Sequence, residues 1–275
     1  MHIQFSILLL KKILTLGFLF WNLLLTAQIV PLPNAHSHND YNRRRPLKDA
    51  LKHGFTSIEA DVLYIYGKLL VGHDMPDSYF PRLKPLNRQY LKPLYRHYKR
   101  RKKEIYKGYE GDFYLWIDIK IYPNQVYQEL RDLLYPIKDM LNYYENGEFH
   151  KGKVTVILSG DRPFDALLND TLQLMTLDGR PEDLDKNYPS HLMPFISENG
   201  GKVAGVEDYN QVDEAAIKRV YEFVQAAHKQ GKKTRLWGTP EDEQLWAKLI
   251  EMEMDLINTD KLNKLKKFLL TAKNE

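Results

Sequence analysis

Short runs of apolar residues alternate along the chain with longer stretches in which apolar positions recur every three to four residues. The short runs predict strands, and the longer stretches predict amphipathic helices. Strands and helices that alternate in this way are typical of a parallel sheet covered by helices. Eight strands are predicted, at residues 29–36, 57–63, 113–119, 154–159, 172–177, 193–197, 234–238 and 255–259.

Helical patterns lie between many of these strands. Gly54 follows the first helix, at a position where glycine often ends one, and Pro240 precedes a helix whose first turn is acidic. The predicted helices are 46–53, 124–144, 215–228, 241–252 and 260–270. Eight strands with helices between many of them, within about 248 residues, predict one α/β domain, a single (β/α)8 TIM barrel over residues 28–275.

Residues 1–27 have the composition of a secretory signal peptide. A lysine pair is followed by the apolar run 13–25 and then by Thr26-Ala27. We therefore expect an exported protein in the periplasm, the cell envelope or the medium. The alternative is an uncleaved N-terminal anchor, although the run is shorter than the roughly 20 residues that a membrane span needs. The chain contains no cysteine, which excludes disulfides and thiolate zinc sites.

The net charge of +4 is modest, but its distribution is uneven. Residues 82–107 contain eleven Lys or Arg and a single acid, Glu104, interleaved with tyrosines. Such a segment indicates peripheral contact with anionic lipid headgroups or envelope polymers, or simply a solvated basic helix. Nucleic acid is not an expected partner of an exported protein. The longer connection 77–112 is predicted to lie at the rim of the active site and to shape substrate choice.

Two predicted strands carry acids on a single face. Glu59 and Asp61 are two residues apart, so both side chains point to the same side of the strand, and Asp118 and Lys120 repeat this spacing. Paired carboxylates inside a barrel suggest a hard divalent cation, Mg²⁺ or Ca²⁺, bound through oxygen. The alternatives are acids that face solvent at an edge and, for Asp118 and Lys120, a simple ion pair.

Two histidines lie next to the acidic strand. His36 ends the first strand and His73 follows the turn at Gly67, so they are candidates for general base and general acid near neutral pH. A lone histidine is more often structural. His38 is a further candidate, as a metal ligand or as a group that supports the ligands.

Taken together, these segments resemble the superfamily of glycerophosphodiester phosphodiesterases and phosphatidylinositol-specific phospholipases C. The resemblance is closest to a subgroup similar to the fungal altered inheritance of mitochondria protein. Its motifs follow the family order over nearly all of residues 28–275. They are Ala35-His36, Glu59-x-Asp61, His73-Asp74, Asp118-x-Lys120, 234–240 with Trp237, and 255–260.

The resemblance implies a phosphoric diester hydrolase that acts on a glycerol- or lipid-type phosphodiester. It implies one Mg²⁺ or Ca²⁺ held by Glu59, Asp61 and Asp118, acid–base catalysis by His36 and His73, and substrate contacts from Lys120 and Trp237. The sequence departs from the family pattern at three points. Ser37 replaces an arginine, a Pro-Glu-Asn element is missing, and aspartate replaces glutamate at position 118.

These departures leave the substrate open, and they support an alternative function. The alternative is a catalytically silent envelope protein that binds a phosphorylated headgroup or a glycan on the same fold. Against it stands the retention of three acids together with two histidines. The sequence contains neither a Gly-x-Ser-x-Gly nor a His-Glu-x-x-His motif, so serine catalysis on a nucleophile elbow and a zinc helix of that type are not expected.

Overall fold

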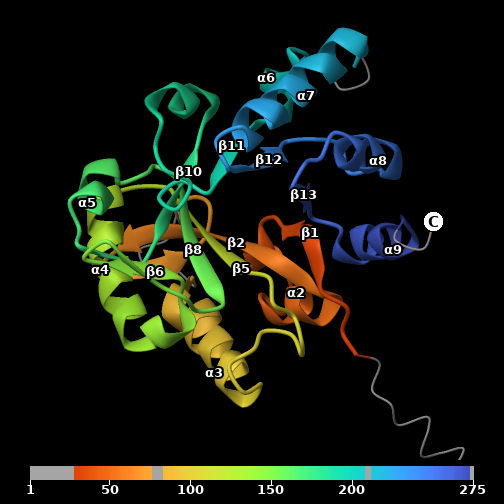
Figure 1. Ribbon diagram of the computed structural model, residues 1–275. Helices are drawn as coiled ribbons and strands as arrows, with labels where there is room; N and C mark the ends of the chain where they lie inside the picture. Colours follow the sequence, from red (N-terminus) through yellow and green to blue (C-terminus); the bar gives the residue numbers. More distant parts are fainter. Residues whose placement is uncertain (1–27, 76–82, 208–211, 273–275) are drawn as a thin grey trace, which may run out of the picture. The chain divides into compact units, whose positions relative to one another are not determined.

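The computed structural model describes residues 28–75, 83–207 and 212–272, and all their helices and strands belong to one compact unit, Pro31–Glu275. Eight parallel strands form a closed barrel, because β1 pairs with β2 on one side and with β13 on the other (Figure 1). The predicted TIM barrel is therefore confirmed. Its strands are β1 (Leu32–Ser37), β2 (Phe55–Ile65), β5 (Phe113–Ile119), β8 (Val154–Gly160), β10 (Thr176–Gly179), β11 (Phe195–Asn199), β12 (Lys233–Trp237) and β13 (Leu256–Thr259).

Helices surround the barrel (Figure 1). They are α2 (Lys48–His53), α3 (Lys92–Arg100), α4 (Pro123–Leu134), α5 (Phe164–Leu168), α6 (Gly200–Ala204), α7 (Glu214–His228), α8 (Glu243–Glu251) and α9 (Leu262–Ala272), with three 3-10 helices at Asp40–Asn42, Tyr135–Met140 and Pro181–Lys186. The predicted helix 124–144 is too long. Its α-helical part ends at Leu134 and a 3-10 helix follows, because Pro136 lacks the N–H donor that would continue the α-helical hydrogen bonds.

The chain continues beyond the carboxyl end of β2 as an antiparallel extension. Strand β3 (Lys68–Val71) pairs with β2, and β4 (Lys84–Pro85) pairs with β3. A π-helix (Asn87–Leu91) and α3 then lead back to the amino end of the barrel, where the Tyr106 hydroxyl donates a 2.6 Å hydrogen bond to the carbonyl of Phe55.

The prediction that the connection 77–112 lies at the active-site rim is therefore right only for its first described part. Leu83, Lys84 and Gln89 border a groove that also contains His73. The rest of the segment is the crossover that a parallel pair of strands requires, so it must reach the opposite end of the barrel. The basic side chains of α3 are exposed on the outside.

Large apolar side chains close the inside of the barrel. Trp116 and Tyr114 each meet the ring of Phe195 edge-on, with ring centres 5.0 Å apart. Ile157 and Leu256 complete this buried cluster. Because inward residues alternate along each strand, polar side chains follow directly above it, towards the carboxyl ends.

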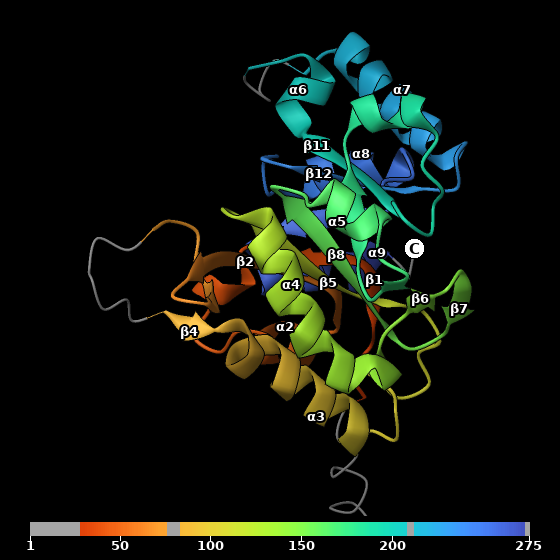
Figure 2. The same ribbon diagram turned by 90° about the vertical axis from the view of Figure 1, so that its left-hand side faces the viewer.

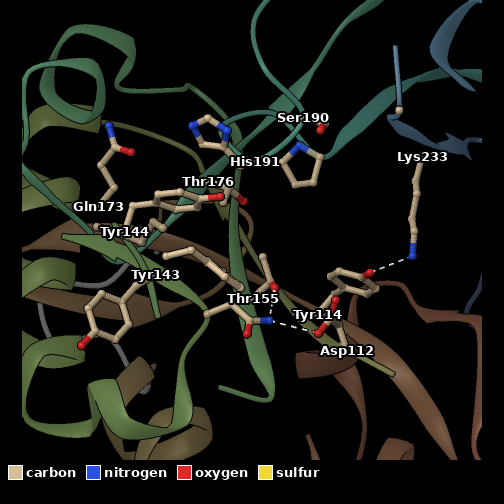
Figure 3. Close-up of a pocket in the computed structure, with 15 residues that line it drawn as sticks. Asp112, Tyr114, Tyr143, Tyr144, Thr155, Gln173, Thr176, Ser190, His191 and Lys233 are labelled. Carbon is tan, nitrogen blue, oxygen red and sulfur yellow. Dashed lines mark hydrogen bonds between the residues drawn. The ribbon is translucent and has the colours of Figure 1, made fainter. Parts of the chain in front are cut away.

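The amino end of the barrel carries a second sheet that the sequence did not predict. It contains β6 (Tyr143–Glu145), β7 (Glu148–His150) and β9 (Leu172–Gln173). Figure 2 shows the β6–β7 hairpin and β4 on opposite sides of the molecule. A cavity of about 290 Å³ lies beside this sheet, lined by residues from the starts of four barrel strands, Tyr114, Thr155, Thr176 and Lys233 (Figure 3).

The predicted signal peptide, residues 1–27, lies outside the described residues. Within the described part of the chain, no helix is both long enough and apolar enough to cross a membrane.

Candidate active site

The structure brings together the three acids predicted as metal ligands. Asp61 of β2 lies directly opposite Asp118 of β5 in the parallel register, and Glu59 is one inward position earlier on β2. One carboxylate oxygen from each acid lies within 4.8 Å of those of the other two. Two neighbouring strands therefore hold three carboxylates at the carboxyl end of the barrel, which is where TIM-barrel enzymes have their active sites.

Asp61 has one oxygen that is fully engaged and one that is not. Its Oδ2 lies 2.7 Å from His73 Nδ1, and it accepts from the Tyr41 hydroxyl and the Lys120 ammonium, both at 3.0 Å. Its Oδ1 is buried and has no hydrogen-bond partner among the described residues. A buried acceptor without a partner is costly, so this oxygen is suited to a bound ligand.

Asp118 repeats this arrangement. Its Oδ2 accepts from Lys120 at 3.2 Å, while its Oδ1 is buried without a partner in the described structure. Burial and the neighbouring charges of Glu59 and Asp61 raise the pKa of Asp118 to about 6, although Lys120 counteracts part of this rise. Without a cation, the carboxyl group of Asp118 is therefore only partly ionised at mildly acid pH.

Glu59 is held through a single oxygen as well. Its Oε2 lies 3.0 Å from His36 Nε2 and accepts a hydrogen bond from Arg235. Its other oxygen, Oε1, lies 3.8 Å from His38 Nε2. Burial alone would raise the pKa of Glu59, but Arg235 and His36 hold this pKa well below its usual range. Glu59 therefore carries its negative charge.

Arg235 is the main site residue that the sequence analysis missed. It is 3% exposed on β12, and its guanidinium lies over the ring of Trp116, 4.3 Å from the ring centre. A charged residue inside a predicted barrel strand was the available signal, because such a charge is buried only with a partner. Its partner Glu59, however, is 176 positions away in the sequence.

His36 is not placed as an accessible acid or base. It is fully buried, and both ring nitrogens are engaged, Nδ1 at 2.8 Å from Ser57 Oγ and Nε2 at Glu59. Ser57 Oγ in turn accepts from the indole N–H of Trp116 at 2.8 Å. Burial, assisted by Arg235, lowers the pKa of His36 to about 4. These contacts make His36 part of the barrel wall behind Glu59.

His38 and His73 are the histidines that are both near the acids and partly exposed. Their side chains are 27% and 58% exposed. In each ring Nδ1 faces an aspartate, at 3.2 Å from Asp260 for His38 and at 2.7 Å from Asp61 for His73. Burial lowers the pKa of His38, but the carboxylates of Asp260 and Glu59 raise that pKa more.

The opposite wall of the barrel mouth is also polar. Asp178 on β10 is buried and accepts from Ser159 at 2.8 Å and from Arg180 at 2.6 Å. Asp178 and Arg180 have the same two-residue spacing as Asp118 and Lys120, and Asp178-Gly179-Arg180 is part of the resemblance to the subgroup, although no site role was predicted for it. Trp237 is the last residue of β12 and is half-buried at this end of the barrel. Its predicted contact with substrate stays a prediction.

The three unpartnered or weakly contacted oxygens fit a hard divalent cation. Glu59 Oε1, Asp61 Oδ1 and Asp118 Oδ1 come from carboxylates whose other oxygens already accept hydrogen bonds. Carboxylate oxygens are the ligands that Mg²⁺ and Ca²⁺ prefer. The cluster thus has the composition and the spacing to hold a metal ion.

Comparison with known proteins relates the chain to a family of phosphodiesterases. Residues 24–176 match the model of the AIM6-like phosphodiesterase domain, and residues 233–263 match that of the glycerophosphoryl diester phosphodiesterase family. Altered inheritance of mitochondria protein 6 of Eremothecium gossypii is 30% identical over 279 residues, covering 89% of this chain and 71% of the relative. A homolog from Arthroderma benhamiae is 28% identical over 267 residues, covering 86% of this chain and 84% of the relative.

A solved structure shares the fold. The glycerophosphodiester phosphodiesterase from Parabacteroides distasonis superimposes with a TM-score of 0.53 over 90% of this chain and 98% of that chain. At 16% identity this likeness concerns the fold alone. The family model, in contrast, matches more than half of the sequence, and the fungal relatives align with most of it. The chain belongs to the family of AIM6-like phosphodiesterases.

Proposed function

We propose that the protein is a metal-dependent phosphoric diester hydrolase that acts on a glycerol- or lipid-type phosphodiester. The observation that carries this proposal is the cluster of three acids, each held through one oxygen and with the other left for a ligand, next to two partly exposed imidazoles. The phosphodiesterase family to which the chain belongs supports the same reaction class.

Glu59, Asp61 and Asp118 would hold one Mg²⁺ or Ca²⁺. When bound there, the cation would supply positive charge to a non-bridging oxygen of the substrate phosphate. Lys120 contacts both Asp61 and Asp118, so it fixes the direction of these ligands. Its ammonium also adds positive charge next to the phosphate position.

We assign the two proton transfers to His38 and His73, in place of the predicted pair His36 and His73. Asp61 lies at Nδ1 of His73, and Asp260 and Asn39 both lie at Nδ1 of His38, so Nε2 is the nitrogen of each ring that we assign to exchange with substrate. One imidazole takes a proton from the attacking hydroxyl, and the other gives a proton to the leaving alkoxide. His36 contributes by holding Glu59, because it has no exposed atom through which it could reach a substrate.

The test is a comparison of histidine variants. Purified protein is assayed against glycerophosphodiesters, lysophospholipids and sphingolipids, with Mg²⁺ or Ca²⁺ and with a chelator. We expect the chelator to abolish turnover, and His38→Gln and His73→Gln each to lower kcat by about 10²–10⁴-fold without changing the melting temperature. His150→Gln, on β7 at the other end of the barrel, is the control and should retain full activity. Full turnover in a folded His38→Gln variant would refute the assignment of His38.

One observation favours the alternative function, a catalytically silent protein that binds a phosphorylated headgroup or a glycan. Lys120 and Arg235 already contribute two positive charges to the three acids, so most of the negative charge is balanced without a cation. Saturable binding of these compounds without any turnover, in the presence of either cation, would support this alternative. Export to the periplasm, the envelope or the medium also remains a proposal, and detection of the mature protein outside the cytoplasm would test it.

A further inference from the structure

The feature that carries a further inference is the way Glu59 is fixed. Its Oε2 accepts from the guanidinium of Arg235 and lies 3.0 Å from His36 Nε2, and that same Arg235 nitrogen lies 2.9 Å from His36 Nε2, so the three groups form one compact cluster. Both partners are buried in the barrel wall. Glu59 therefore cannot turn to present both oxygens to a cation without losing these contacts, and only Oε1 remains available.

Arg235 is itself held rigidly. Its guanidinium stacks on Trp116, its Nε lies 3.4 Å from Ser197 Oγ, and its Nη2 lies 3.9 Å from Asp178 Oδ2. The planar guanidinium fork can make these contacts simultaneously, which the compact ammonium of lysine cannot. The clamp on Glu59 thus depends on an arginine at this position and not only on a positive charge.

The other two acids are restricted in the same way. Asp61 Oδ2 lies within hydrogen-bonding distance of Tyr41, His73 and Lys120, and Asp118 Oδ2 accepts from Lys120. Each acid therefore offers one oxygen, and the three acids together offer three. Ca²⁺ takes six to eight oxygens and often binds carboxylates through both of theirs, whereas Mg²⁺ uses few carboxylates and keeps several waters.

We propose that the clamp of Arg235 and His36 on Glu59 makes this a magnesium site that discriminates against Ca²⁺. Arg235 is a positioning residue: it acts on the cation through Glu59 and touches neither cation nor substrate. The inference rests on the proposed function, because it requires that the three acids bind a divalent cation.

The experiment measures cation selectivity and needs no substrate. Dissociation constants for Mg²⁺ and Ca²⁺ are obtained by displacement of Mn²⁺, followed by electron paramagnetic resonance, in wild type, Arg235→Lys and Arg162→Lys. Arg162 is a matched control, because its guanidinium also stacks on a ring, Phe164, and pairs with a buried acid, Asp183, at 2.7 Å.

We expect the wild type to bind Mg²⁺ more tightly than Ca²⁺. In Arg235→Lys the charge is kept but Glu59 is released, so we expect Mg²⁺ affinity to fall by about 10–100-fold and the preference for Mg²⁺ to be lost or reversed. Arg162→Lys should keep the wild-type ratio. If Arg235 only balanced charge, the lysine variant would behave as wild type.

The possible failures are distinguishable. A wild type that binds neither cation would overturn the proposed function and this inference together. A wild type that binds Ca²⁺ more tightly would overturn the inference and leave the proposed function intact. An unchanged ratio in Arg235→Lys would overturn the role of Arg235. Even if Arg235→Lys does not fold, the wild-type ratio still decides whether the site discriminates against Ca²⁺.

Discussion

Asp118 illustrates how neighbouring residues set the chemistry of a single carboxyl group. Burial and two acidic neighbours raise its pKa to about 6, although Lys120 lies 3.2 Å away. Without a cation, ionisation of this group therefore opposes folding. A bound cation would reverse the effect, because it stabilises the ionised form. Metal binding and proton release at this residue are thus coupled.

This coupling predicts a pH-dependent stabilisation by metal. The pKa of Asp118 is higher in the folded chain than the ordinary value of 3.8, so the stability it contributes is present below 3.8 and is lost as pH rises through about 6. A bound cation offsets this loss of stability only at pH values at which Asp118 is ionised. We therefore expect a saturating divalent cation to raise the melting temperature more at about pH 7.5 than at about pH 5.

The measurement is thermal unfolding with and without the cation at both values of pH. Asparagine at position 118 does not titrate. In Asp118→Asn we therefore expect the cation to raise the melting temperature less than in wild type, and by a similar amount at both values of pH. Equal stabilisation of the wild type at both values would contradict the coupling.

The residues that were hardest to place from the sequence are those whose partners are distant. His36 and His38 are two positions apart, and the predicted strand, 29–36, ends one residue before β1 does. Strand alternation turns His36 into the barrel wall, and the chain leaves the strand after Ser37, which puts His38 at the rim. Glu59 and Asp61 could be predicted because strand spacing places them on one face, and the family resemblance added Asp118 from the neighbouring strand.

At the scale of elements, the apolar pattern located each barrel strand, and β5 has the predicted bounds, 113–119. The fifth predicted strand, 172–177, begins before the barrel strand that it was meant to describe. Leu172–Gln173 forms β9 and pairs with β6 in the separate sheet, so the barrel strand β10 begins only at Thr176. An apolar run cannot reveal which of two sheets it joins, because that choice depends on pairing with distant residues.

The end of β8 provides a further prediction. Gly160 has a φ of +70°, and a Cβ at this position would overlap Asp118 Oδ1 and the carbonyl oxygen of Ile119. We expect Gly160→Ala to weaken binding of the divalent cation by displacing Asp118, in addition to costing about 1–2 kcal/mol for the left-handed backbone. Isothermal titration with the cation and denaturant unfolding would measure the two effects.

Gly147, in the turn between β6 and β7, is a matched control. Its φ is +84°, but no atom lies within 4 Å of the position of an added Cβ. Gly147→Ala should therefore show the backbone cost with normal cation affinity. Equal affinities in the two variants would argue against a role of Gly160 in placing Asp118.

At the scale of the whole molecule, the two ends of the barrel carry different groups of residues. The acids and the partly exposed histidines lie at the carboxyl ends of the strands, and the second sheet and its cavity lie at the amino ends (Figure 3). The basic helix α3 runs along the outside. Its cations Lys92, Arg96 and Arg100 are exposed, and they are the basis for the predicted contact with an anionic surface.

This contact can be tested with vesicles. Each exposed cation contributes about 1 kcal/mol near an anionic bilayer, and salt screens the attraction. We expect sedimentation with phosphatidylglycerol vesicles, release at high salt, and loss of binding when Lys92, Arg96 and Arg100 are replaced by glutamine. Replacing Lys264, Lys266 and Lys267 of α9 removes the same charge elsewhere and should leave binding intact. Equal loss in both variants would indicate attraction by net charge alone.

The aromatic cluster of Trp116, Tyr114 and Phe195 closes the barrel below the acids. These side chains fill the barrel interior, so the site opens only towards the carboxyl ends of the strands. Under the proposed function, both products would therefore leave by the route along which the next substrate arrives. A product that lingers at the mouth would therefore act as a competitive inhibitor, and turnover would slow as it accumulates.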